Sequence, residues 1–191
     1  MGISEINYDI QFEPLFSNFT FKGMEILSFK TTPSNKFVLN CAEIKIKKCY
    51  ILSKNKTIDV NFKLDAKKES LSIVSKNKVS GKIKLCIEYT GILNDRLLGF
   101  YRSKYTDPSG KTKYMATTQF EAADARRAFP CWDEPATKAT FNVSLLVEKN
   151  YMAISNMPVR KKQNFGSKII YEFERTPIMS TYLLYLGVGE F

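Results

Sequence analysis

Residues 82–89 read Lys-Ile-Lys-Leu-Cys-Ile-Glu-Tyr, with an apolar side chain at every second position. Successive side chains of a β-strand point to opposite faces of the sheet, so this alternation predicts a strand with one buried and one solvated face. Phe, Tyr, Ile, Val and Thr are frequent along the whole chain, and these residue types favour strands. The segment therefore predicts a β-sheet that covers a hydrophobic core.

Similar runs recur along the sequence, separated by residues that favour turns. We expect further strands at residues 8–12, 58–64, 71–74, 141–147, 169–173 and 182–186. Turns are expected at 32–35 (Thr-Pro-Ser-Asn), 53–56 (Ser-Lys-Asn-Lys) and 107–110 (Asp-Pro-Ser-Gly). This spacing predicts a mainly β, multi-sheet antiparallel fold similar to a β-sandwich. No repeat or linker divides the chain, so we expect residues 1–191 to form a single domain.

The composition is that of a globular protein, with 44% hydrophobic and 25% charged residues. No apolar run is long enough for a membrane span, and the N-terminal residues lack the pattern of a secretory signal. The four cysteines are not arranged as C-x-x-C pairs, so we interpret them as small buried residues in a reducing compartment. We expect a cytoplasmic protein with no membrane partner.

The net charge of +10 is concentrated in residues 45–84, which contain twelve lysines against three acidic residues. A nucleic-acid-binding surface could have this composition. The run contains no arginine and few aromatic residues, which are the side chains that bind phosphates in a fork and stack on bases. Lysines that alternate with apolar residues also fit the solvent faces of strands, and lysine on an edge strand deters aggregation. We therefore favour a solvated face over a nucleic-acid site.

The alternation breaks at residues 119–135, which read QFEAADARRAFPCWDEP. Residues 122–128 predict a short helical turn, because Pro130 and Pro135 prevent a longer helix. Two interpretations remain open for the charges here: a salt-bridged loop that fastens two sheets, or a ligand site on a rigid scaffold. The charged residues of this segment are Glu121, Asp124, Arg126, Arg127, Asp133 and Glu134.

The chain contains no histidine, which excludes most catalytic arrangements. Neither a Ser-His-Asp triad nor an H-E-x-x-H zinc helix can form. No C-x-x-C pair or histidine is present to build a mixed metal site. We therefore expect no catalytic residue and no metal ligand within this chain.

Residues 118–135 (TQFEAADARRAFPCWDEP), with 99–105 (GFYRSKY) and 187–191 (GVGEF), resemble the zinc aminopeptidase family. Within the family they are most similar to the puromycin-sensitive aminopeptidases and the archaeal tricorn-interacting factors. The resemblance implies a saddle-like N-terminal domain of antiparallel sheets that covers a catalytic domain. It also implies zinc in the full-length enzyme, a peptide N-terminus as substrate, and the missing catalytic domain as partner.

The resemblance assigns roles to residues of this segment. Glu121 would reach the active site and bind the free α-amine of the substrate, and Gln119 and Phe120 would shape the first side-chain pocket. The remaining residues, Asp124, Arg126, Arg127 and Asp133, would hold the loop in place. The family's Gly-Ala-Met-Glu-Asn strand and its zinc helix are absent, so the chain would supply one wall of the pocket.

Two other functions remain open at this point. The chain could be an independent β module that captures free peptide N-termini or a protein partner. It could also be a basic module that binds nucleic acid through the lysines of residues 45–84, which we rank last.

Overall fold

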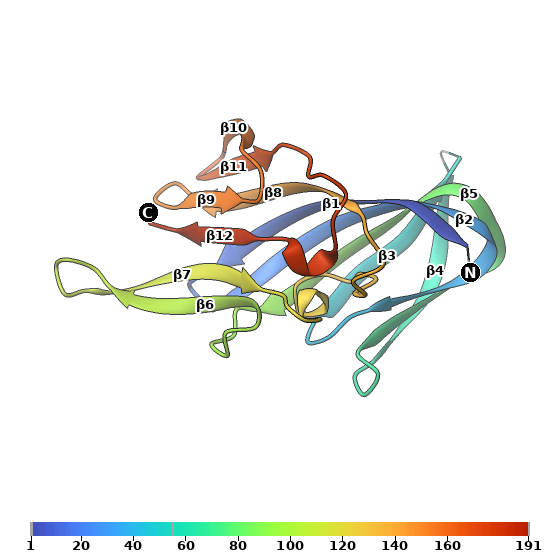
Figure 1. The fold of residues 1–191 in the computed structure, drawn as a ribbon, viewed down its shortest axis with the longest axis horizontal. Coiled ribbons are helices and arrows are strands. Elements are labelled where there is room, and N and C mark those ends of the chain that lie inside the picture. Colours follow the sequence, from blue (N-terminus) through green and yellow to red (C-terminus); the bar gives the residue numbers. More distant parts are fainter. Residues whose placement is uncertain (1, 55, 191) are drawn as a thin grey trace.

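A computed structural model describes residues 2–54 and 56–190 and arranges them mainly in two β-sheets (Figure 1). The large sheet has the strand order β10-β11-β8-β1-β2-β5-β3-β4 and the small sheet the order β6-β7-β12-β9. The large sheet contains β1 (Ile3–Leu15), β2 (Thr20–Asn40), β3 (Lys45–Ser53), β4 (Lys56–Asp65), β5 (Ser70–Ile92), β8 (Thr140–Glu148), β10 (Val159–Phe165) and β11 (Lys168–Phe173). The small sheet contains β6 (Gly99–Thr106), β7 (Thr112–Gln119), β9 (Met152–Ser155) and β12 (Leu186–Gly189). The predicted mainly β, multi-sheet fold is confirmed.

Helical structure in the described residues is limited to two 3₁₀ turns, η1 (Ala125–Arg127) and η2 (Thr181–Leu183). No helix in this part of the chain has the length and apolar character needed to span a membrane.

Strand pairing is antiparallel throughout the described residues except between β1 and β8, which run parallel with Asn7 opposite Thr140. A parallel pair cannot be joined by a tight hairpin and needs a long connection. The whole segment from β2 to β7 lies between these two strands in the sequence. This pair departs from the antiparallel arrangement that the strand pattern predicts.

The turn expected at residues 32–35 is wrong, because these residues lie inside the long strand β2. They form an irregularity in the pairing with β5, where the register shifts between Thr31 and Ser34 and again between Ser34 and Lys36. The facing strand contains Gly81, whose φ of 78° is accessible to glycine at little cost. Turn residues here produce a bulge in two long strands rather than a reversal of the chain.

The other two expected turns connect hairpins. The turn at 107–110 joins β6 to β7, and the Asp107 carboxylate accepts hydrogen bonds from the backbone N–H groups of Ser109 and Lys111. The turn at 53–56 joins β3 to β4, although Asn55 lies outside the described residues.

The strand expected at 182–186 is also wrong for most of its length. Residues Thr181–Leu183 form η2, closed by a hydrogen bond from the Leu184 N–H to the Thr181 carbonyl, and β12 begins only at Leu186. Apolar character without alternation does not distinguish a strand from a turn packed on the core.

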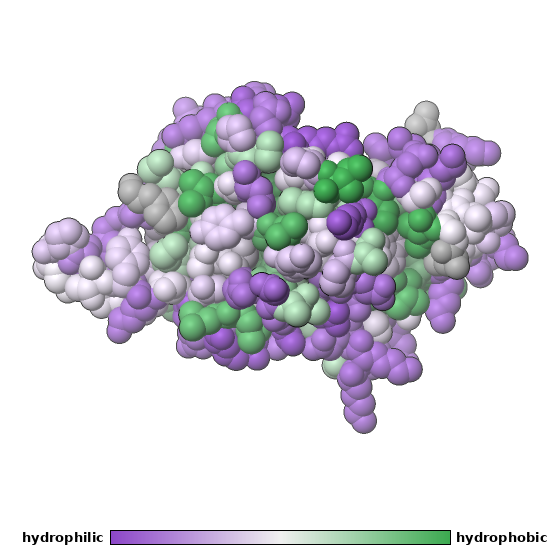
Figure 2. All heavy atoms as spheres, in the orientation of Figure 1, coloured by the Kyte–Doolittle hydropathy of each residue, from purple (hydrophilic) through white to green (hydrophobic). Residues whose placement is uncertain are grey.

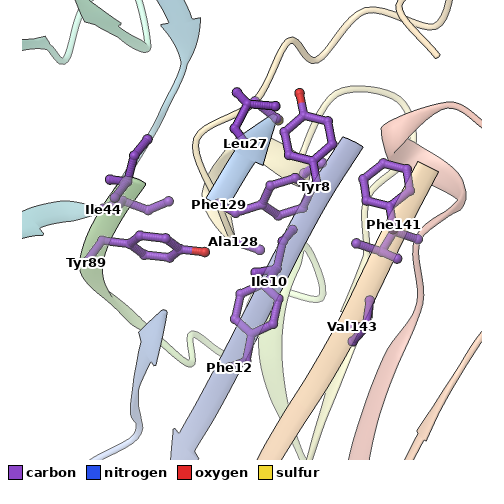
Figure 3. Close-up of a cluster of buried hydrophobic side chains, with 14 of the residues drawn as sticks. Tyr8, Ile10, Phe12, Leu27, Ile44, Tyr89, Ala128, Phe129, Phe141 and Val143 are labelled. Atoms are coloured by element: carbon purple, nitrogen blue, oxygen red, sulfur yellow. The ribbon is translucent and has the colours of Figure 1, made fainter. Parts of the chain in front are cut away.

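Aromatic side chains join the two sheets and the segment between β7 and β8 into one core. Phe100 of β6 packs against Phe12 of β1 and Phe21 of β2, with ring centroids 5.7 and 5.3 Å apart. The ring centroid of Phe129 lies 5.6 Å from that of Tyr8 and 6.3 Å from that of Phe12, in edge-to-face geometry (Figure 3).

The four cysteines are free and buried, as the sequence predicts.

Candidate functional site

The candidate site is the segment that follows β7, residues 119–135. Gln119, the last residue of β7, and Glu121 are exposed, whereas Phe120 between them is buried and packs edge-to-face on Phe129. The Asp124 N–H donates a hydrogen bond of 2.9 Å to the Phe120 carbonyl and closes a turn. The backbone is thus anchored at Phe120, and the two flanking polar side chains project from the surface.

The predicted helical turn is present in a shorter form as η1. Ala125 and Ala128 are fully buried, and the N–H groups of Ala128 and Phe129 both donate to the Ala125 carbonyl. The small alanine side chains allow the turn to pack closely on the core. Pro130 follows directly and cannot donate to the helix.

Arg127 pairs with three carboxylates. Its Nε lies 2.8 Å from Asp124, its Nη1 lies 2.9 Å from Glu43, and its Nη2 lies 2.9 Å from Glu69. Burial opposes the charge, but the hydrogen bond with Asp124 and the two other carboxylates outweigh it and raise the pKa of the guanidinium. Because Glu43 and Glu69 flank the β3–β4 hairpin region, Arg127 fastens the turn to the large sheet.

Arg126 makes a second connection through Asp133, which is only 3% exposed. The Arg126 Nε and backbone N–H lie 3.0 and 3.2 Å from Asp133 Oδ2, and Thr181 Oγ1 donates to Oδ1 at 2.7 Å. Burial disfavours the Arg126 charge, yet its bonds to Asp133 and Glu69 raise the pKa. Buried charges that are paired and hydrogen-bonded in this way lock a local structure.

Backbone contacts complete the attachment of the segment to β1 and β2. Asn40 and Cys131 exchange two backbone hydrogen bonds of 2.7 and 3.0 Å. The Trp132 indole N–H donates to the Val38 carbonyl, and the Trp132 backbone N–H donates to the Tyr8 hydroxyl. No local sequence pattern marks Glu43, Glu69 or Asn40 as partners of this segment, because each lies more than 50 positions from the residue that it binds.

Glu121 stands outside this network. Within residues 2–54 and 56–190 it has no hydrogen bond and no ion pair, although Arg126 and Arg127 lie only a few positions further along the chain. The structure therefore brings Asp124, Arg126, Arg127 and Asp133 into one paired cluster, and it leaves the carboxylate of Glu121 free in solvent.

The donor set of this chain does not fit a zinc ion. Histidine is absent from the sequence, and no group of three acidic or cysteine side chains among the described residues is arranged around a common point. Burial raises the pKa of Cys41 and of Cys49 to about 12, which disfavours the thiolate that zinc requires.

Nearly the whole chain is similar in sequence to known proteins. Residues 4–183 match the peptidase M1 N-terminal domain. The chain is 43% identical to Aminopeptidase 2 of Candida albicans over 99% of its own length and 20% of that protein. It is 44% identical to the alanine/arginine aminopeptidase of Saccharomyces cerevisiae, again over 99% of its length and 22% of that protein. It is 36% identical to Aminopeptidase M1 of Arabidopsis thaliana over 96% of its length and 22% of the plant protein. The chain thus spans about a fifth of the length of these curated relatives.

Proposed function

The chain belongs to the peptidase M1 N-terminal domain family, and on this premise we propose that it forms one wall of the substrate pocket of a zinc-dependent aminopeptidase. In this proposal the Glu121 carboxylate binds the protonated α-amine of a peptide substrate. The observation that carries the assignment is that Glu121 is exposed and unpaired among the described residues, while both neighbouring arginines are saturated with carboxylates. A free carboxylate on a fixed backbone is well suited to charge-assisted hydrogen bonds with an ammonium group.

The paired cluster of Asp124, Arg126, Arg127 and Asp133 has a positioning role in this proposal. It holds the turn after β7 against the large sheet, so the backbone that carries Glu121 is already in place when substrate binds. Phe120 is buried at 1% exposure, so the proposal assigns it the role of an anchor beneath the pocket. Gln119 remains a candidate contact on the pocket wall because its side chain is exposed.

The zinc ion would be held by the part of the enzyme outside this chain, where it would polarise the scissile carbonyl and activate water. Exposed apolar residues support docking of a further domain. Met152 and Ile154 of β9 and Leu183 of η2 are 48%, 42% and 50% exposed, on elements of the small-sheet side. Figure 2 shows several hydrophobic patches on the face of the molecule that carries the small sheet. A cytoplasmic location is part of the proposal and is supported by the four free, buried thiols.

A chimeric enzyme tests the proposal. The chain replaces the matching N-terminal fifth of the Saccharomyces alanine/arginine aminopeptidase, and hydrolysis of an aminoacyl reporter is measured. Glu121→Ala removes one hydrogen bond to a charged group, worth about 1.5–3 kcal/mol, so kcat/KM should fall about ten- to 150-fold. Glu121→Gln should recover part of this loss, because the amide oxygen still accepts a hydrogen bond.

Glu134→Ala is the matched control, since Glu134 is an exposed carboxylate in the same segment and makes no side-chain bond to a described residue. It should leave kcat/KM within about twofold, as surface changes away from a site usually do. Equal activity of the Glu121→Ala and parent chimeras would show that Glu121 does not bind the substrate amine.

A further inference from the structure

A concave surface lies on the face of the large sheet opposite the core. It is a cavity of about 620 Å³ between the sheet and the segment that follows β11. Its lining includes four cationic side chains, Lys82, Lys84, Lys138 and Arg175. We propose that this cavity, here termed the basic pocket, binds a small oxyanion that carries two or more phosphate or carboxylate groups.

The floor of the basic pocket is a row of polar residues across four neighbouring strands. The register places Lys84 of β5 opposite Ser28 of β2, Ser28 opposite Asn7 of β1, and Asn7 opposite Thr140 of β8. Their neighbours in sequence, such as Tyr8 and Leu27, are buried on the core face. Alternation along each strand therefore directs this row away from the core.

Hydrogen bonds organise one side of this floor. Arg175 Nη2 donates to Thr140 Oγ1 at 2.6 Å, and Thr140 Oγ1 donates to Asn7 Oδ1 at 2.8 Å. The side-chain oxygen of Asn7 accepts this hydrogen bond, so the side-chain NH₂ group of Asn7 is the part that can donate a hydrogen bond to a ligand. The Ser28 hydroxyl forms no hydrogen bond with another described residue and can also donate. The floor thus presents neutral donors beside the cations, which suits oxygen atoms of an anion.

The cations of the basic pocket have no ion-pair partner within the described chain. None of Lys82, Lys84, Lys138 and Arg175 forms an ion pair with another described residue. The one carboxylate in the lining, Glu5, pairs with Lys30 at 3.6 Å. Asp9 on β1 is a second carboxylate within electrostatic range of Lys84.

Lys30 of β2, which pairs with Glu5, stands directly opposite Lys82 of β5. Like charges in directly opposed positions of an antiparallel pair destabilise the sheet. A bound polyvalent anion would relieve this repulsion and would make several contacts at once. The cavity volume is in the range of small-molecule sites, which favours a compact anion over an extended polymer.

Calorimetric titration of the purified chain with sodium tripolyphosphate and, separately, with citrate at constant ionic strength tests the proposal. Saturable binding of one anion per chain is expected, and the two titrations show whether phosphate or carboxylate groups are preferred. Lys84→Gln and Arg175→Gln should each weaken binding about tenfold, since each removes a charge-assisted contact. Lys63→Gln, which removes an exposed lysine of β4 outside the pocket, should bind as the parent does.

A second measurement does not depend on variants. Titration of the ¹⁵N-labelled parent chain should shift the side-chain amide signals of Asn7 and Asn142, both of which line the pocket. Absence of saturable binding would overturn the proposal. An equal loss in Lys63→Gln would also overturn it, because it would indicate general attraction to a basic protein.

Discussion

Glu25→Gln tests how this fold tolerates an unpaired acid in its core. Glu25 lies on the core face of β2 with no exposed surface, and both its carboxyl oxygens lack a hydrogen-bond partner among the described residues. Burial raises the pKa of Glu25 well above the ordinary value of 4.5. The groups around it cannot compensate a negative charge, because they are themselves weak acids whose pKa values are raised by burial and by Glu25: Tyr8, Tyr89, Cys41, Cys49 and Cys131.

The sign of the pH dependence follows from the raised pKa. The folded state holds the proton of this carboxyl more tightly than the unfolded state does. When the pH rises above the unfolded pKa, the unfolded state loses its proton first, and this shifts the equilibrium towards unfolding. Between the unfolded and folded pKa values the free energy of unfolding therefore falls by about 1.4 kcal/mol per pH unit. For a chain of this length that slope corresponds to a Tm that falls about 3–6 °C per pH unit. Glu25→Gln keeps the shape of the side chain and removes the proton equilibrium, so its contribution to the slope disappears.

Thermal unfolding followed by circular dichroism from about pH 5 to about pH 8 measures this difference. The Tm of the parent minus that of Glu25→Gln should become steadily more negative as the pH increases. Glu88→Gln removes an exposed carboxylate from neighbouring strand β5 and shows how much the loss of any negative charge contributes. Parallel Tm curves for the parent and Glu25→Gln across this range would refute the interpretation that Glu25 is held protonated in the folded chain.

Two further predictions concern stability. Gly23→Ala places a Cβ atom 2.1 Å from the ring of Tyr89, so it should lower the free energy of unfolding by about 1–3 kcal/mol in urea titrations; a loss below about 0.5 kcal/mol would show that the ring moves aside freely. Asp133→Asn breaks a buried pair with Arg126 and should cost about 3 kcal/mol in the same assay. Asp95→Asn, at a carboxylate that is 72% exposed, should cost less than about 1 kcal/mol, and equal losses at both positions would contradict the argument from burial.

Local periodicity predicts several of the strands but not how the strands are ordered. The run at 82–89 lies within β5 and the run at 8–12 within β1, as their alternation predicts. The parallel pairing of β1 with β8 depends on contacts between residues about 130 positions apart, which no local pattern records. The residues at 32–35 do favour a turn locally. Continued pairing of β2 with β5 on both sides of the irregularity overrides that preference and leaves a bulge.

The pairing of the charged residues at the site could not be predicted from the sequence. The sequence marks residues 121–134 as a charged segment, but a list of charges does not show which of them are neutralised in the folded chain. Arg126 and Arg127 are saturated because Glu43 and Glu69 approach from a distant hairpin. The arginines nearest to Glu121 in the sequence are therefore already paired, and Glu121 has no ion pair with any described residue. The reverse holds in the basic pocket, where four cations share a lining with a single carboxylate, Glu5, that pairs with Lys30 instead. Availability for a ligand is therefore a property of tertiary pairing rather than of composition.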